Sequence, residues 1–174
     1  MGQIIVNQII RIVFLVLLQS LVVSKIQLFD GLILPWVYIF AILMLPFETP
    51  RWLVLVTAFL VGLVMDYFTG PMGLHTISCT VLGFMQPLVQ NLLAPREGYE
   101  ITERPTIQKM GLPWYLTYSA ILAFIHHTVL FFLEVLRLSG FFSTLLHITL
   151  SVIGTMVLMV IGQYLIYNAK PSDS

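Results

Sequence analysis

The chain has 174 residues, of which 59% are hydrophobic and 9% charged, whereas soluble domains carry about 25% charged residues. Eight basic and eight acidic side chains cancel, and the mean hydropathy is +0.97. This composition predicts a single integral membrane domain over residues 1–174 and excludes a basic surface for nucleic acid. The single cysteine, Cys79, excludes an internal disulfide and a cysteine-based metal site.

The first apolar run, residues 4–23, predicts a membrane span that closes at Lys25. An alternative is a secretory signal with Arg11 in its charged region and residues 12–23 as its apolar core. The cleavage site of such a signal would be weak, and no soluble domain that needs export follows it. We therefore expect a first span.

The second apolar run, residues 32–47, has 16 residues, slightly fewer than the roughly 17 that a span needs. We expect a short second span. In an alternative with five spans this run is re-entrant, which would place the two termini on opposite sides of the membrane. Pro46 and Pro50, with the charges of Glu48 and Arg51, then predict a loop.

The remaining apolar runs predict four further spans, at residues 52–68, 75–93, 113–133 and 141–166. Pro87 should kink the fourth span or mark the start of its exit. Residues 94–112 form the one long polar stretch and predict a solvated loop. The expected fold is therefore all-α, a bundle of about six transmembrane helices.

Basic residues near the span ends predict the orientation of these spans. With six spans, six basic residues fall on the side of the N-terminus and two on the other: Arg11, Arg51, Arg96, Arg104, Lys109 and Lys170 against Lys25 and Arg137. Both termini should therefore be cytoplasmic, and the turn at residues 70–73 should face outward.

Asp66 is an acid inside an apolar run, and a turn with Gly70, Pro71 and Gly73 follows it before His75. An ionisable group within a span is costly, so it has a partner or a task. The interpretation we favour is structural, with the carboxylate accepting hydrogen bonds from the turn or from the start of the next helix. On that interpretation Asp66→Asn should be tolerated; a charge needed by a partner or a proton is the alternative.

Histidines in the apolar runs raise the question of a metal site or a proton relay. The side chains of His126 and His127 diverge by about 100° on a helix and cannot face one metal. We expect interhelical hydrogen bonds and neither a metal nor a cofactor. Glu134 and Arg137 are three apart and can pair. The histidines in question are His75, His126, His127 and His147.

Pairs of small residues four apart would allow helices to approach closely. No serine, cysteine or lysine lies in a nucleophile motif, so the sequence predicts no enzyme. The small pairs are Ala58 with Gly62, Cys79 with Gly83, and Ser151 with Thr155.

Residues 60–83 read LVGLVMDYFTGPMGLHTISCTVLG. An apolar helix that ends in an aspartate, a glycine-rich turn and a helix opening with Gly-Leu-His resembles the rod shape-determining protein MreD family. The length of the chain and the prolines around its second and third spans also fit that family. The match is carried by Gly62, Asp66, Gly70, Gly73, Leu74 and His75.

The resemblance implies a fold similar to the substrate-binding components of energy-coupling-factor vitamin transporters. It also implies a non-catalytic scaffold in the bacterial inner membrane that helps maintain rod shape by organising lateral peptidoglycan synthesis. The implied partners are membrane lipid, MreC, the actin-like MreB, a RodA-type glycosyltransferase and its transpeptidase. The alternative is a small-molecule-binding or transport subunit of the energy-coupling-factor type, whose polar groups would be Asp66, His75, Gln86, Gln90, Asn91 and His126.

Overall fold

The structure is a computed structural model that describes residues 2–25, 31–70, 73–99, 103–135 and 141–167. These residues contain helices and no β-strand, which confirms the all-α prediction. The helices are α1 (Gly2–Leu21), η1 (Val23–Lys25), η2 (Val37–Ile39), α2 (Phe40–Leu43), α3 (Arg51–Thr69), α4 (Leu74–Leu92), α5 (Ile107–Met110), α6 (Leu112–Val135) and α7 (Phe141–Tyr167).

Among the described residues, four stretches are long and apolar enough to cross a membrane: Val6–Lys25, Arg51–Thr69, Leu112–Val135 and Phe141–Ile166. Helices α3, α4, α6 and α7 begin and end within two residues of the spans predicted at residues 52–68, 75–93, 113–133 and 141–166, although α4 is not among the four candidate spans. Pro87 lies inside α4, which continues to Leu92, so the helix does not end at this proline.

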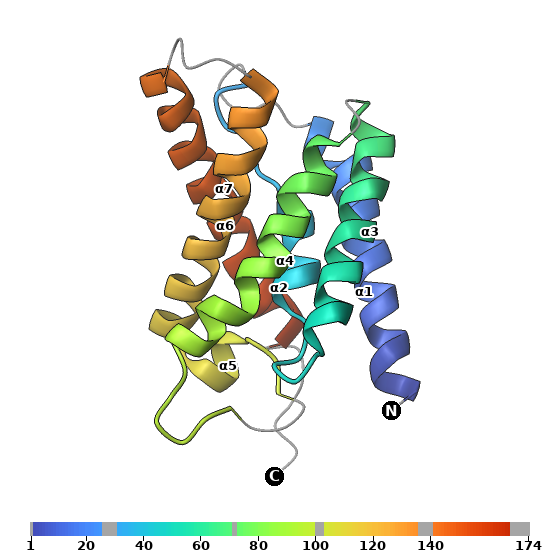
Figure 1. The fold of residues 1–174 in the computed structure, drawn as a ribbon, viewed down its shortest axis with the longest axis vertical. Coiled ribbons are helices and arrows are strands. Elements are labelled where there is room, and N and C mark those ends of the chain that lie inside the picture. The colour runs from blue at the N-terminus through green and yellow to red at the C-terminus, as the bar shows by residue number, and fades with distance from the viewer. Residues whose placement is uncertain (1, 26–30, 71–72, 100–102, 136–140, 168–174) are drawn as a thin grey trace.

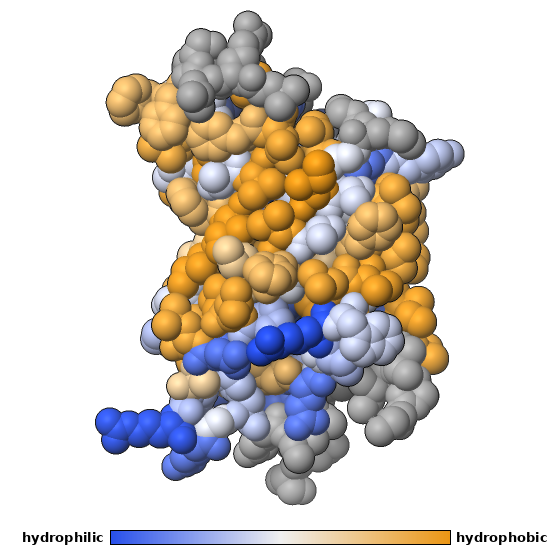
Figure 2. Space-filling model, viewed as in Figure 1, coloured by the Kyte–Doolittle hydropathy of each residue, from blue (hydrophilic) through white to orange (hydrophobic). Residues whose placement is uncertain are grey.

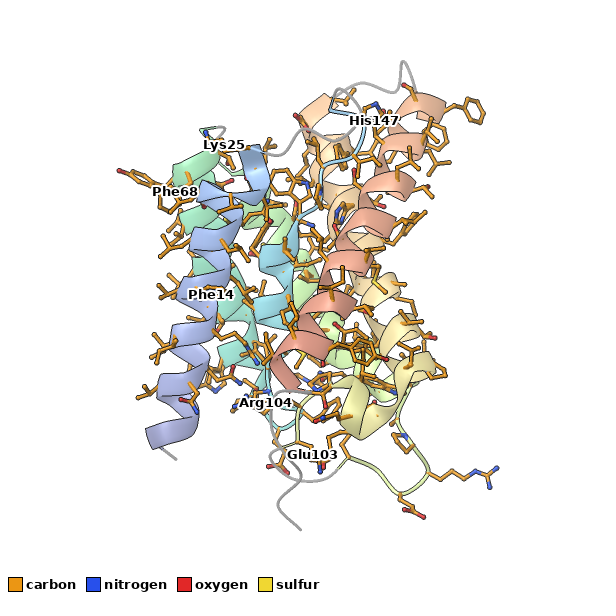
Figure 3. The ribbon with its side chains drawn as sticks, turned by 180° about the vertical axis from the view of Figure 1, so that it is seen from behind. Phe14, Lys25, Phe68, Glu103, Arg104 and His147 are labelled. Atoms are coloured by element: carbon orange, nitrogen blue, oxygen red, sulfur yellow. The ribbon has the colours of Figure 1, made fainter. Side chains whose placement is uncertain are left out.

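The long helices run side by side between two ends of the molecule (Figure 1). The loop end carries α5, Glu103 and Arg104, and the opposite end, the Lys25 end, also carries His147 (Figure 3). The beginning of α1 and the end of α7 both lie at the loop end. Helix α3 packs against α4, α4 against α6, and α6 against α7.

The outer surface of the bundle is hydrophobic between its two ends. Figure 2 shows apolar side chains over most of one face and hydrophilic side chains gathered toward the loop end. Exposed apolar residues of the bundle include Phe59, Phe84 and Phe124, from α3, α4 and α6. Such a surface suits contact with lipid chains, because large exposed apolar areas are rare on soluble monomers.

Residues 31–45, which we name the buried segment, do not form the helical span expected at residues 32–47. The chain is irregular as far as Trp36, and only Val37–Leu43 is helical. Pro35 explains the late start, because proline lacks an amide hydrogen and disfavours the helical conformation in the residue before it. The segment still passes from the Lys25 end to the start of α3, and residues 37–45 are all buried.

The first half of the buried segment takes its hydrogen bonds from side chains of other helices. The amide nitrogens of Leu34 and Trp36 donate to the hydroxyls of Ser151 and Thr155 on α7, both at 3.0 Å. On α1, Gln19 accepts from the amide of Val37 at 2.7 Å and donates to the carbonyl oxygen of Pro35 at 3.2 Å. An irregular backbone at membrane depth needs such partners, because lipid supplies none.

The second half of the segment exposes the carbonyl groups at the end of α2, and three helices supply donors to them. Arg11 on α1 donates to the oxygen of Met44 at 2.7 Å and to that of Ala41 at 3.5 Å. Its positive charge suits the negative end of the helix dipole. Gln86 on α4 donates to Ile42 at 3.2 Å, and Tyr118 on α6 donates to Leu43 at 3.0 Å.

Gln19→Met should destabilise the protein, because it removes the acceptor of the Val37 amide and the donor of the Pro35 carbonyl. We expect the loss of about 1–3 kcal/mol that follows from leaving a buried polar group unpaired. The measurement is the thermal midpoint of the detergent-solubilised protein. Asn7→Leu is the matched control, since Asn7 is exposed on the same helix, and equal losses in both variants would contradict the role of Gln19.

The described residues of the polar stretch, 94–99 and 103–112, do not form only the solvated loop that we expected. They contain α5, and the ring of Tyr99 stacks on Phe47 with centroids 3.9 Å apart. Burial raises the pKa of the Tyr99 phenol, which donates to the carbonyl oxygen of Gln90 at 2.6 Å. Lys109 and Glu103 form an ion pair at the same end. The ring and the hydroxyl of Tyr99 therefore fasten the loop to the bundle ahead of α5.

Candidate functional site

Asp66 lies near the end of α3 and holds the first turn of α4. Its Oδ1 accepts from the amide of His75 at 2.8 Å, and its Oδ2 accepts from the amides of Gly73 at 2.8 Å and Thr76 at 3.1 Å. The hydroxyl of Thr76 also donates to Oδ2. The side chain is only 1% exposed. The capping interpretation is confirmed: an acid from the preceding helix satisfies amides that Gly73, which has no side chain, cannot cap.

Close packing of α3 on α4 brings Asp66 within reach of those amides. A Cβ on Gly62 would lie 2.5 Å from the carbonyl oxygen of His75 and 2.6 Å from the Cα of Thr76. A Cβ on Gly83 would lie 2.7 Å from the Cβ of Ala58. The prediction that small residues allow close approach is confirmed for this pair of helices.

The turn between the two helices depends on glycine at its two described ends. Gly70 and Gly73 both have φ of +99°, a conformation that other residues resist. Leu74 is the first residue of α4. Pro71 lies outside the described residues, and the turn geometry expected for Gly70 and Gly73 is confirmed.

Next to this hairpin lies a buried cluster of polar side chains centred on Tyr38, which we name the tyrosine cluster. The hydroxyl of Tyr38 is 2.8 Å from Nδ1 of His75 on α4 and 2.7 Å from Nε2 of His126 on α6. The thiol of Cys79 donates to the same oxygen at 3.5 Å. The ring of Trp36 packs edge-on against His75, with centroids 4.7 Å apart.

Sequence reasoning identified His75 and His126 but missed Tyr38, their shared partner. A signal was present, because a tyrosine within an apolar run needs a partner for its hydroxyl when it is buried. Which partner it takes depends on how α4 and α6 pack around the buried segment, and no local pattern encodes that.

His127 points to a different neighbour from His126, as the expected divergence requires. Its Nδ1 is 2.8 Å from the carbonyl oxygen of Ala123, and its Nε2 is 3.1 Å from the hydroxyl of Thr155 on α7. As we expected, His126 and His127 each form a hydrogen bond with a side chain of another element. Within the described ranges, no group of three or more His, Cys, Asp or Glu side chains is arranged to hold a metal ion.

The other polar candidates lie apart from the tyrosine cluster. Glu134 and His147 line a cleft of about 330 Å³ at the Lys25 end, between α6 and α7. Arg137 lies outside the described residues, so the expected pairing with Glu134 is not placed. Gln86 donates a hydrogen bond to a carbonyl oxygen near the end of α2. Gln90 donates to the hydroxyl of Tyr118 at 3.4 Å, and Asn91 is exposed.

Fold and site together define an all-helical protein with several membrane-spanning helices and a buried polar core. No protein-family model, curated protein or solved structure matches this chain. The resemblance to the MreD family therefore rests on residues 60–83 and on what those residues do in the α3–α4 hairpin.

Proposed function

We propose that this protein is a non-catalytic scaffold of the bacterial cell-elongation machinery, helping to maintain rod shape by organising lateral peptidoglycan synthesis. The observation that carries the proposal is the α3–α4 hairpin. The described residues of the family pattern have structural roles in this hairpin. Gly62 permits the close approach of α3 to α4, and Asp66 caps α4. Gly70 and Gly73 make the turn, and His75 forms a hydrogen bond with Tyr38 in the tyrosine cluster.

In this proposal the chain crosses the inner membrane six times, through the four candidate spans, α4 and the buried segment. The loop end, with Arg51, Arg96, Arg104 and Lys109, faces the cytoplasm, because basic residues gather on that side of membrane proteins. The beginning of α1 and the end of α7 are then cytoplasmic, and the α3–α4 turn faces outward. A fold similar to the substrate-binding components of energy-coupling-factor transporters is part of the same proposal.

The surface offered to partner helices lies within the bilayer. A groove of about 350 Å³ runs between α1 and α3, and its walls are almost entirely apolar. Helices associate in lipid mainly through packing, so such a groove can receive side chains of a membrane-anchored partner of the MreC or RodA type. Its walls come from Ile9, Ile12, Val13, Val16, Leu17, Thr57, Leu60, Val61, Val64 and Phe68.

Deleting the gene in its rod-shaped host should give rounded cells, because lateral wall synthesis would lose its organiser. A plasmid copy should restore the rods, and protein purified from it in mild detergent should carry elongation proteins, identified by mass spectrometry. Cells that stay rod-shaped with normal wall insertion would contradict the proposal.

The second candidate is a small-molecule-binding or transport subunit. The interrupted buried segment favours it, because transport proteins often build binding sites where helices break at mid-membrane depth. The same purified preparation separates the two candidates. A vitamin or lipid headgroup retained in stoichiometric amount, with no elongation protein, would favour binding or transport over the scaffold.

A further inference from the structure

The three hydrogen bonds to the oxygen of Tyr38 restrict where the protons of the tyrosine cluster can lie. The oxygen of Tyr38 can donate one hydrogen bond and accept two. It has three neighbours: Nδ1 of His75, Nε2 of His126 and the thiol of Cys79. Since the thiol donates, one imidazole must donate to Tyr38 and the other must accept from it.

The surroundings of His126 decide which imidazole donates. Its Nδ1 is buried and has no hydrogen-bond partner among the residues that the structure describes, so a proton there would be an unpaired buried donor. We therefore assign the proton of His126 to Nε2, which donates to Tyr38. The hydroxyl of Tyr38 then donates to Nδ1 of His75, and each of the three hydrogen bonds to the oxygen of Tyr38 has one proton.

An additional proton on His75 destroys this arrangement. Its Nδ1 becomes a donor, so the oxygen of Tyr38 faces three donors and its own proton loses its acceptor. The cluster can keep both imidazole bonds only by moving the proton of His126 to Nδ1, for which the described part of the chain offers no acceptor. Protonation therefore weakens the link between the buried segment and its neighbours in either case.

His75 is the member of the cluster best placed to receive that proton. It is 4% exposed, whereas His126 is 0% exposed. The Asp66 carboxylate accepts from the backbone of His75, so a negative charge lies on that side of the cluster. The titratable groups around the cluster are Asp66 on α3, Tyr38 of the buried segment, Cys79 on α4, and His126 and His127 on α6.

We propose that the tyrosine cluster is a pH-sensitive latch: it holds the buried segment against α4 and α6 while both imidazoles are neutral, and releases the segment when His75 takes up a proton. The part released is the half near the Lys25 end, where Trp36 also packs on His75. This inference goes beyond the scaffold function and does not depend on it.

Cys79 reports the state of the latch, because it is the single cysteine of the chain, is fully buried and contacts Tyr38. The full-length protein in lipid vesicles is labelled with a small membrane-permeant thiol reagent between about pH 5 and 8, the range in which histidine titrates. The wild-type rate is divided by that of His75→Asn, whose amide can accept from Tyr38 without titrating. This ratio cancels the pH dependence of thiol chemistry.

We expect the ratio to rise roughly tenfold from neutral to acid pH, as opening of the latch exposes Cys79. His147→Asn, a histidine outside the cluster, should show the wild-type response. Tyr38→Phe should label rapidly at neutral pH and gain nothing in acid. If that variant does not fold, the comparison of His75→Asn with His147→Asn still decides. A ratio that stays constant, or a response lost in His147→Asn, would overturn the latch.

Discussion

Asp66→Ala should lower the thermal midpoint of the detergent-solubilised protein by about 10 °C, the largest loss expected for a polar substitution in this chain. The change leaves the amides of Gly73, His75 and Thr76 without their acceptor at the start of α4. Hydrogen bonds to a charged group contribute about 1.5–3 kcal/mol each, and buried groups left unpaired add to the loss. We therefore expect about 3–5 kcal/mol in total.

Asp66→Asn should fall between wild type and alanine, which revises the expectation that asparagine would be tolerated. One amide oxygen can still accept from His75, but the amide nitrogen would face the donors of Gly73 and Thr76 that now share Oδ2. Measuring both variants in the same detergent separates the two effects. An asparagine variant as stable as wild type would show that Oδ2 contributes nothing.

Gly62→Ala should be comparably damaging, although it adds a single methyl group. The new Cβ would lie 2.5 Å from the carbonyl oxygen of His75 and 2.6 Å from the Cα of Thr76, both backbone atoms that cannot rotate away. The two helices must separate, which also lengthens the hydrogen bonds of Asp66. Overpacking typically costs about 1–3 kcal/mol, and the weakened cap should bring the loss to at least about 3 kcal/mol.

Gly162→Ala is the matched control, because a Cβ at that position has no neighbour within 4 Å. It should leave the thermal midpoint unchanged or raise it slightly, since alanine favours helix over glycine by about 1 kcal/mol. Both variants are compared by fluorescence-detected size-exclusion chromatography after heating. If Gly62→Ala and Gly162→Ala have the same thermal stability, the close approach of α3 to α4 does not require glycine at position 62.

Features that depend on residues close together in the sequence were predictable from it. Long apolar runs identified α3, α4, α6 and α7, because a helix that faces lipid must be apolar over most of its length. The cap of Asp66 was predictable because its acceptor and donors lie within ten residues of one another, across a glycine turn. The divergence of His126 and His127 followed from helix geometry alone.

The course of the buried segment was decided only by tertiary structure. The apolar run at residues 32–47 favours a membrane span but does not show whether these residues form a complete helix. Because Pro35 interrupts the helix, backbone groups near it lack partners within the segment. Their hydrogen-bond partners are Gln19 on α1 and Ser151 and Thr155 on α7.

By itself the sequence determined a helical membrane protein with an acid-capped hairpin, because span length, helix period and turn chemistry are local properties. Tertiary structure determined that Tyr38 joins His75 and His126, and that Arg11 reaches the end of α2. Those contacts connect residues 33 to 88 positions apart. They arise from the packing of whole helices, since every polar group buried in the bundle must find its partner there.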